Sequence, residues 1–200
     1  MNKLFFEALK NSTDEEYFTY FMTYLISPII TGIKPSSIIS ITNNKNMLSV
    51  WRKNKIKFLD SLDLEHIILR KKYNAETVLI YNKNNLSKIL KCTKIRSLLE
   101  SYGYTNLDDT QLVLLYLKER FKIEAFPHEI GIFLGIPLHD VRDFIDCKDK
   151  PCLLCGYWKV YSNEEYSKKI FEKYDISKEL VVSYLLQGKN LKFLSNNFFA

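Results

Sequence analysis

Glycine and proline are scarce in this sequence, with six and five residues in a chain of 200. Collagen-like chains and linker-dominated chains need far more of both, so these classes are excluded. Apolar residues are not scarce, since 46% of the residues are hydrophobic and 14% are aromatic. That content is enough to build a core in a chain of this length. We therefore expect one globular domain over residues 1–200.

Long apolar runs are also missing. The most apolar stretch, residues 17–33, contains Pro28 and Gly32 and is shorter than the roughly 20 residues that a membrane span needs. Acidic residues at 7 and 14–16 stand where a signal peptide has its basic start and apolar stretch. We expect a cytoplasmic protein with no membrane span, in a compartment where thiols stay reduced.

Several motifs that carry catalysis are absent from the sequence. There is no glycine-rich phosphate loop, no G-x-S-x-G elbow, no H-E-x-x-H pair and no paired-carboxylate motif. Catalysis is therefore uncertain, and a non-catalytic binding or accessory module is the interpretation that we favour.

The spacing of apolar residues predicts helices near both ends of the chain and strands in its first half. Two β-rich runs separated by only three residues are typical of a hairpin. We expect strands at 37–42, 66–73, 77–81 and 157–161, and two closing helices at 164–174 and 178–186. The predicted fold class is α+β, a small antiparallel sheet of about three to four strands packed by helices, with a mainly helical C-terminal half.

Positive charge is concentrated in one stretch. The chain has a formal net charge of +6, but residues 45–96 alone carry 13 basic and 4 acidic residues, a local excess of +9. Such a field attracts nucleic acid, another polyanion, or an acidic or phosphate-bearing partner. The alternative is that these lysines only solvate helix faces.

Four cysteines offer the sharpest spacing in the sequence. Cys147, Cys152 and Cys155 follow a C-x4-C-x2-C pattern, and Cys92 lies far upstream as a possible fourth ligand. Three or four thiolates can hold zinc or an iron–sulfur cluster. Cys152 and Cys155 alone can form a redox dithiol, and all four can also be ordinary thiols.

Residues 126–145 resemble a helix-turn-helix in their apolar spacing. In the helix that would enter the DNA groove, Asp140, Asp143 and Asp146 outnumber Arg142, and DNA repels such a surface. We therefore do not expect specific DNA binding, and interpret the segment as two short packed helices.

Three segments together carry a resemblance to a known family. They are residues 27–35, the run FPHEIGIFLG at 126–135 with its continuation to Val141, and CGYWKVY at 155–161. On these strings the chain resembles DUF3793, a bacterial family of proteins of unknown function found in Firmicutes. The resemblance spans residues 27–194 and implies a shared fold but no activity. Relatives often carry a His and a Cys just before the Ser/Ala-Pro pair, where this chain has Leu25 and Ile26.

The polar residues of the resembling segments are Lys34, His128 and Glu129. If they meet beside the sheet, they form a small anion or cofactor site, or the pocket of an enzyme. Structural roles are the alternative, because a His that follows Pro127 at a helix start is often a cap.

Overall fold

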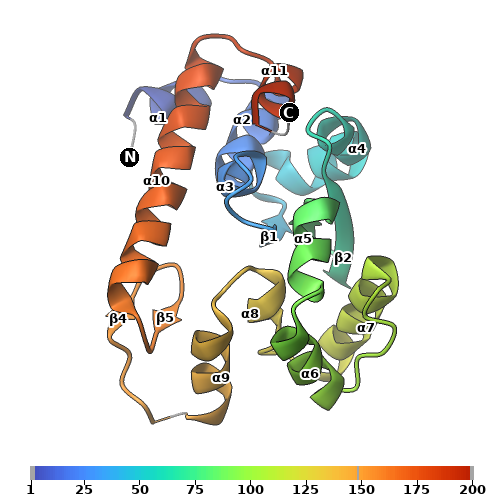
Figure 1. Ribbon diagram of the computed structural model, residues 1–200. Coiled ribbons are helices and arrows are strands. Elements are labelled where there is room, and N and C mark those ends of the chain that lie inside the picture. The colour runs from blue at the N-terminus through green and yellow to red at the C-terminus, as the bar shows by residue number, and fades with distance from the viewer. Residues whose placement is uncertain (1–2, 148, 199–200) are drawn as a thin grey trace. The chain divides into compact units, whose positions relative to one another are not determined.

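The computed structural model describes residues 3–147 and 149–198 (Figure 1). The chain divides into two compact units, residues 1–82 with 173–200 and residues 83–172. The expectation that residues 1–200 form one domain stays a prediction, because a division into two units does not by itself test it. In the described residues, no helix combines the length and apolarity that crossing a membrane requires.

The first unit holds the larger sheet and the helices that cover it. Its elements are α1 (Lys3–Lys10), α2 (Asp14–Leu25), α3 (Ser27–Ile30), β1 (Ser36–Thr42), a 3-10 turn (Asn44–Asn46), α4 (Met47–Asp60), β2 (Glu65–Lys71), β3 (Ala75–Tyr81), the second part of α10 (Glu164–Leu186) and α11 (Leu191–Phe198). A capping box starts α2: the Thr13 hydroxyl accepts from the Glu16 amide, and the Glu16 carboxylate accepts from the Thr13 amide. This arrangement satisfies amide groups that a helix start leaves without partners.

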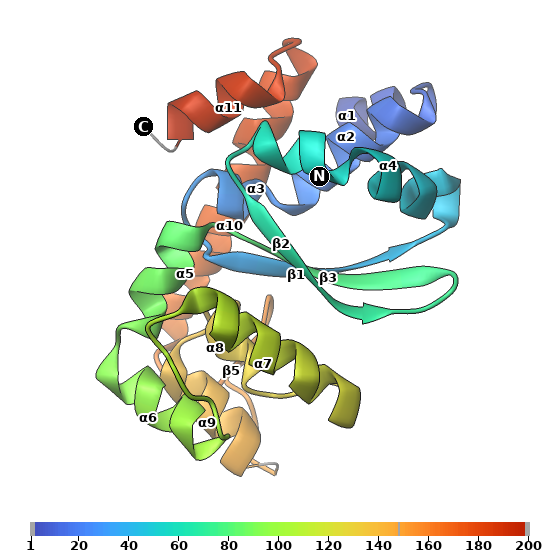
Figure 2. The same ribbon diagram turned by 90° about the vertical axis from the view of Figure 1, so that its right-hand side faces the viewer.

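The sheet has the order β1-β3-β2, and both neighbouring pairs are antiparallel. β3 is the central strand, with Leu79 opposite Ile38 on one side and opposite Ile67 on the other. α2 and α4 lie side by side on one face of the sheet (Figure 2). Burial of Met22, Trp51 and the other apolar side chains of this layer stabilises the first unit.

One buried carboxylate connects the sheet to α4. Glu76 on β3 is 1% exposed, and its oxygens accept from Trp51 Nε1 at 3.1 Å and from Arg52 Nε at 2.8 Å. Burial alone would raise the pKa of Glu76, but these two hydrogen bonds and the charges of Arg52 and Lys55 lower it overall. The ionised carboxylate therefore ties helix and sheet together.

The second unit is mainly helical. Its elements are α5 (Lys83–Leu90), α6 (Thr93–Ser101), α7 (Thr110–Ile123), α8 (Ile130–Phe133), α9 (Leu138–Asp146), the two-residue strands β4 (Leu154–Cys155) and β5 (Lys159–Val160), and the start of α10. The Asp109 side chain caps α7 by accepting from the amides of Gln111 and Leu112. Gly135, at a φ of 77°, makes the turn between α8 and α9 that most other residues resist.

The α+β class, the small antiparallel sheet and the mainly helical C-terminal half are confirmed. The two closing helices predicted at 164–174 and 178–186 are wrong, because α10 runs without a break from Glu164 to Leu186. Residues 175–177 contain no proline or glycine, and the Ser177 hydroxyl donates to the Tyr174 carbonyl at 2.8 Å. The helix therefore continues through them.

We expect Glu76→Gln to lower the free energy of unfolding by about 1–3 kcal/mol, because the amide cannot accept from both Trp51 and Arg52. The pKa of Glu76 is lower in the folded than in the unfolded state, so its ionised form stabilises the fold at pH values above the unfolded pKa. This stabilisation is lost as pH falls below about 4.5. Urea denaturation at pH 7 and pH 4 measures both effects. Glu7→Gln, at an exposed position of α1, is the control. Equal stability of the two variants at pH 7 would contradict the assignment.

Candidate functional site

A buried aspartate joins two of the segments that carry the family resemblance. Asp140 on α9 is 1% exposed. Its Oδ2 accepts from Trp158 Nε1 at 2.8 Å, and its Oδ1 accepts from the amides of Tyr161 at 2.9 Å and Ser162 at 3.2 Å. All three donors belong to the β4–β5 hairpin or to the residues directly after β5. The hairpin is therefore held against α9 by one carboxylate.

The hairpin also packs on the start of α10. The rings of Trp158 and Phe171 lie edge to face at 4.4 Å, and the Tyr157 ring lies 5.4 Å from that of Phe171. A Cβ at position 156 would clash with the Phe171 ring, so Gly156 is required for this close approach. The GYW string thus fixes the hairpin between α9 and α10.

An apolar pocket of about 330 Å³ opens between α8, α9 and the hairpin. This volume is within the range of small-molecule sites. Its interior is lined by Ile130, Gly131, Leu134, Ile136, Val141 and Trp158. Three aromatic side chains at its margin keep much of their surface exposed, Phe126 at 48%, Phe144 at 39% and Tyr157 at 40%.

Two basic side chains of the lining meet at one aromatic ring. The His128 ring lies edge to face with Phe144 at 5.0 Å, and Lys159 Nζ lies 5.9 Å from the centroid of the same ring. Asp140 also belongs to the lining, but its oxygens accept from the hairpin. Lys159 therefore offers a positive charge at the margin of this pocket, while Asp140 is engaged by the hairpin.

Glu129 lies in the interior rather than beside His128. Its side chain is 0% exposed, and Oε1 accepts from Arg120 Nε at 2.8 Å and from the Tyr104 hydroxyl at 3.2 Å. Burial, together with the negative charge of Glu129, raises the pKa of Tyr104. Glu129 Oε2 is buried without a hydrogen-bond partner among the described residues. This geometry supports a structural role for Glu129.

Lys34 belongs to the first unit, whereas His128 and Glu129 belong to the second. The Lys34 amide donates to the Pro28 carbonyl at 2.8 Å, and its Nζ lies 5.7 Å from the centroid of the Tyr174 ring. Burial, with a smaller effect from the charge of Lys178, lowers the pKa of Lys34 to about 8. Each of the three residues contacts its own unit, and a site that joins them stays a prediction.

The four cysteines are free thiols that the structure groups only in part. Cys92, Cys147 and Cys155 are exposed and Cys152 is half-buried. A hydrogen bond with Cys152, followed in effect by burial, raises the pKa of Cys155, so these two thiols are neighbours. Across residues 3–147 and 149–198, no three His, Cys, Asp or Glu side chains gather to hold a metal ion. A metal site, a redox dithiol and ordinary thiols therefore all stay predictions for these cysteines.

The basic stretch 45–96 is divided between the two units after Asn82. Among its cations, Arg52 forms an ion pair with Glu76, Lys53 with Glu15 and Arg96 with Asp108. Glu15 and Asp108 lie outside the stretch, so part of its excess charge is balanced by residues that a local count leaves out. Binding of nucleic acid or another polyanion stays a prediction.

Sequence reasoning missed the pocket residues Phe144, Trp158 and Lys159 as members of a site. Trp158 and Lys159 lie in the GYWKVY string, whose density of aromatic side chains was the available signal. Phe144 carries no such signal, because an aromatic residue in a short amphipathic helix is usually part of the core. His128, which the sequence offered as a ligand-binding candidate with Lys34 and Glu129, lines this pocket with other neighbours.

We expect Asp140→Asn to lower the free energy of unfolding by about 1–3 kcal/mol, because the amide nitrogen cannot accept from the N–H groups that face it. The amides of Tyr161 and Ser162 should also exchange their hydrogens faster, which hydrogen-exchange NMR measures residue by residue. Asp149→Asn, at an exposed position, should change neither quantity. Unchanged exchange in the Asp140 variant would contradict its role in holding the hairpin.

A family model described as a protein of unknown function (DUF3793) matches residues 22–195. Neither the curated proteins nor the solved structures with which the chain was compared include a match. The family match covers most of the chain, including α2 from Met22 onward and both segments that Asp140 connects. The chain therefore belongs to the DUF3793 family.

Proposed function

We propose that this protein is a non-catalytic binding module whose second unit holds a small aromatic or aliphatic molecule bearing a carboxylate. The observation that carries the proposal is the apolar pocket of about 330 Å³ with His128 and Lys159 at one ring of its margin. Pockets of this size with a few polar groups are the usual form of small-molecule sites.

The chemistry of the lining selects the ligand class. Burial of apolar ligand surface against Ile130, Leu134 and Val141 provides binding free energy but does not orient the ligand. The Lys159 ammonium orients the ligand by pairing with an anionic group at the margin. Trp158 is held by Asp140 and can take part as a fixed aromatic wall.

Binding is tested with two ligands of one shape, naphthalene-2-carboxylate and the neutral 2-naphthamide, by isothermal titration calorimetry. We expect both to bind, and the carboxylate to bind about tenfold more tightly, which corresponds to about 1.4 kcal/mol from one charged contact. Leu134→Trp should abolish binding of both, because the larger side chain fills the pocket.

Lys159→Gln should remove the preference for the carboxylate and leave binding of the amide unchanged. Lys94→Gln, at an exposed position on α6 of the same unit, is the matched control and should preserve the preference. Absence of binding by both ligands to the unmodified protein would refute the pocket as a site. Equal binding of the two ligands would refute recognition of an anion.

A second candidate function rests on the C-x2-C spacing of Cys152 and Cys155, two free thiols of which Cys155 is exposed and Cys152 is half-buried. We propose that they act as a redox dithiol that reacts with a small disulfide such as oxidised glutathione. One thiolate attacks the disulfide and releases one glutathione thiol, and the other then displaces the second. The two protein thiols are oxidised to one disulfide while glutathione disulfide is reduced to two thiols.

The dithiol is tested by mass spectrometry after equilibration with oxidised and reduced glutathione. We expect an internal disulfide between Cys152 and Cys155 in the unmodified protein and in the control Cys92→Ser. In Cys152→Ser, Cys155 should instead keep glutathione as a mixed disulfide, because no neighbouring thiol can release it. Mixed disulfides at all four cysteines of the unmodified protein, without an internal one, would exclude the dithiol.

A further inference from the structure

The side-chain amine of Lys34 lies half-buried in the first unit, directly after α3. The Lys34 amide donates to the Pro28 carbonyl at 2.8 Å, and Pro35 follows in the sequence, so the backbone is fixed on both sides of the residue. Lys34 Nζ lies 5.7 Å from the centroid of the Tyr174 ring on α10. In the part of the chain that the structure describes, this Nζ has neither an ion pair nor a hydrogen bond.

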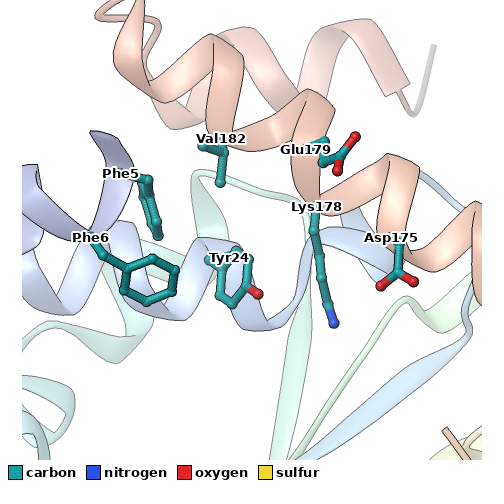
Figure 3. Close-up of a pocket in the computed structure, with 7 residues that line it drawn as sticks. All are labelled: Phe5, Phe6, Tyr24, Asp175, Lys178, Glu179 and Val182. Atoms are coloured by element: carbon teal, nitrogen blue, oxygen red, sulfur yellow. The ribbon is translucent and has the colours of Figure 1, made fainter. Parts of the chain in front are cut away.

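A second lysine of the same unit lies near Lys34. Lys178 follows Tyr174 by one turn of α10, and its Nζ lies 5.7 Å from the centroid of the Tyr24 ring. Together with Tyr24 and Asp175, Lys178 lines a pocket of about 380 Å³ between α1, α2 and α10 (Figure 3). Two lysines and two tyrosine rings therefore form one cluster, and small solutes can reach its Lys178 side through this pocket.

The surroundings keep part of the Lys34 side chains uncharged near neutral pH. Burial, with a smaller effect from the charge of Lys178, lowers the pKa of Lys34 to about 8. At pH 7 about a tenth of the Lys34 side chains are then neutral amines, against about one in three thousand for a lysine of ordinary pKa. Only the neutral amine has the free electron pair that attacks a carbonyl carbon. Lys34 thus combines a fixed position with the properties of a nucleophile.

We propose that Lys34 is a modification site that small acyl phosphates acylate directly. The amine nitrogen attacks the carbonyl carbon of the donor, the bond from this carbon to the phosphate oxygen breaks, and inorganic phosphate leaves. The nitrogen gives one proton to water, and an amide remains on the side chain. The site belongs to the first unit, so it is independent of the pocket and the dithiol proposed for the second unit.

The charges of the cluster favour this class of donor and this product. An acyl phosphate is an anion and releases an anion, and both are attracted by the positive potential of Lys34 and Lys178. The acylated side chain has no charge, so it loses neither hydration energy on burial nor energy from repulsion by Lys178. These are the two effects that lower the pKa of the unmodified amine. Acylation therefore replaces an unfavourable buried charge with a neutral group.

The reaction is tested with limiting acetyl phosphate, and acetylation is measured at each lysine by peptide mass spectrometry. At pH 7 we expect the initial rate at Lys34 to exceed that at Lys173, an exposed lysine of α10, at least about tenfold. The rate at Lys34 should level off above about pH 8. In urea-denatured protein the two rates should be equal, and the rate at Lys34 should rise up to about pH 10. Equal rates at the two lysines of the folded protein would overturn the proposal.

Two variants test the contribution of the neighbouring ammonium. Lys178→Met should slow acetylation of Lys34 at pH 7 about threefold, because the pKa of Lys34 rises and the donor is attracted less. Lys178→Arg keeps the charge and should keep the rate, and Lys173→Met is the matched control on the same helix. An unchanged rate in Lys178→Met, or an equal loss in Lys178→Arg, would refute the role of this charge.

Discussion

The arrangement of the second unit depends on the carboxylate of Asp140 and the three nitrogen atoms that donate to it. Moving a carboxylate out of water costs several kcal/mol unless hydrogen bonds replace those of the solvent. Here the indole of Trp158 and two backbone amides replace them. The same contacts place Trp158 in the wall of the pocket, so the stability of the hairpin and the shape of the site have one cause.

Each unit contains a buried glutamate whose carboxylate accepts hydrogen bonds from other side chains. The two glutamates differ in whether both carboxylate oxygens have a donor. Both oxygens of Glu76 accept from side chains of α4. Glu129 has an ion pair with Arg120, but its Oε2 is without a partner among the described residues. A partly satisfied buried group destabilises relative to a fully satisfied one. Glu76 therefore stabilises the first unit more than Glu129 stabilises the packing around Arg120.

Local patterns predicted the elements of the fold, while contacts distant in sequence determined the site. The hairpin of β2 and β3 was predictable because two β-rich runs stand only three residues apart, and the start of α2 because Thr13 and Glu16 form a local capping box. The link from Asp140 to Trp158 spans 18 residues and leaves no local trace. By sequence alone Asp140 is expected as a negative charge on a helix surface, whereas it is buried in the structure. A metal or redox role of the cysteines stays a prediction from their spacing.

Residue type alone does not determine which charge of the second unit's pocket is available to a ligand. The lining contains aromatic rings, the ammonium of Lys159 and the carboxylate of Asp140. Asp140 is buried and accepts from three N–H groups of the protein, whereas Lys159 is exposed. A buried carboxylate whose oxygens already accept hydrogen bonds has little to offer a ligand cation, because the ligand would have to displace those donors. The proposed preference for an anionic ligand therefore depends on the same hydrogen bonds that hold the hairpin.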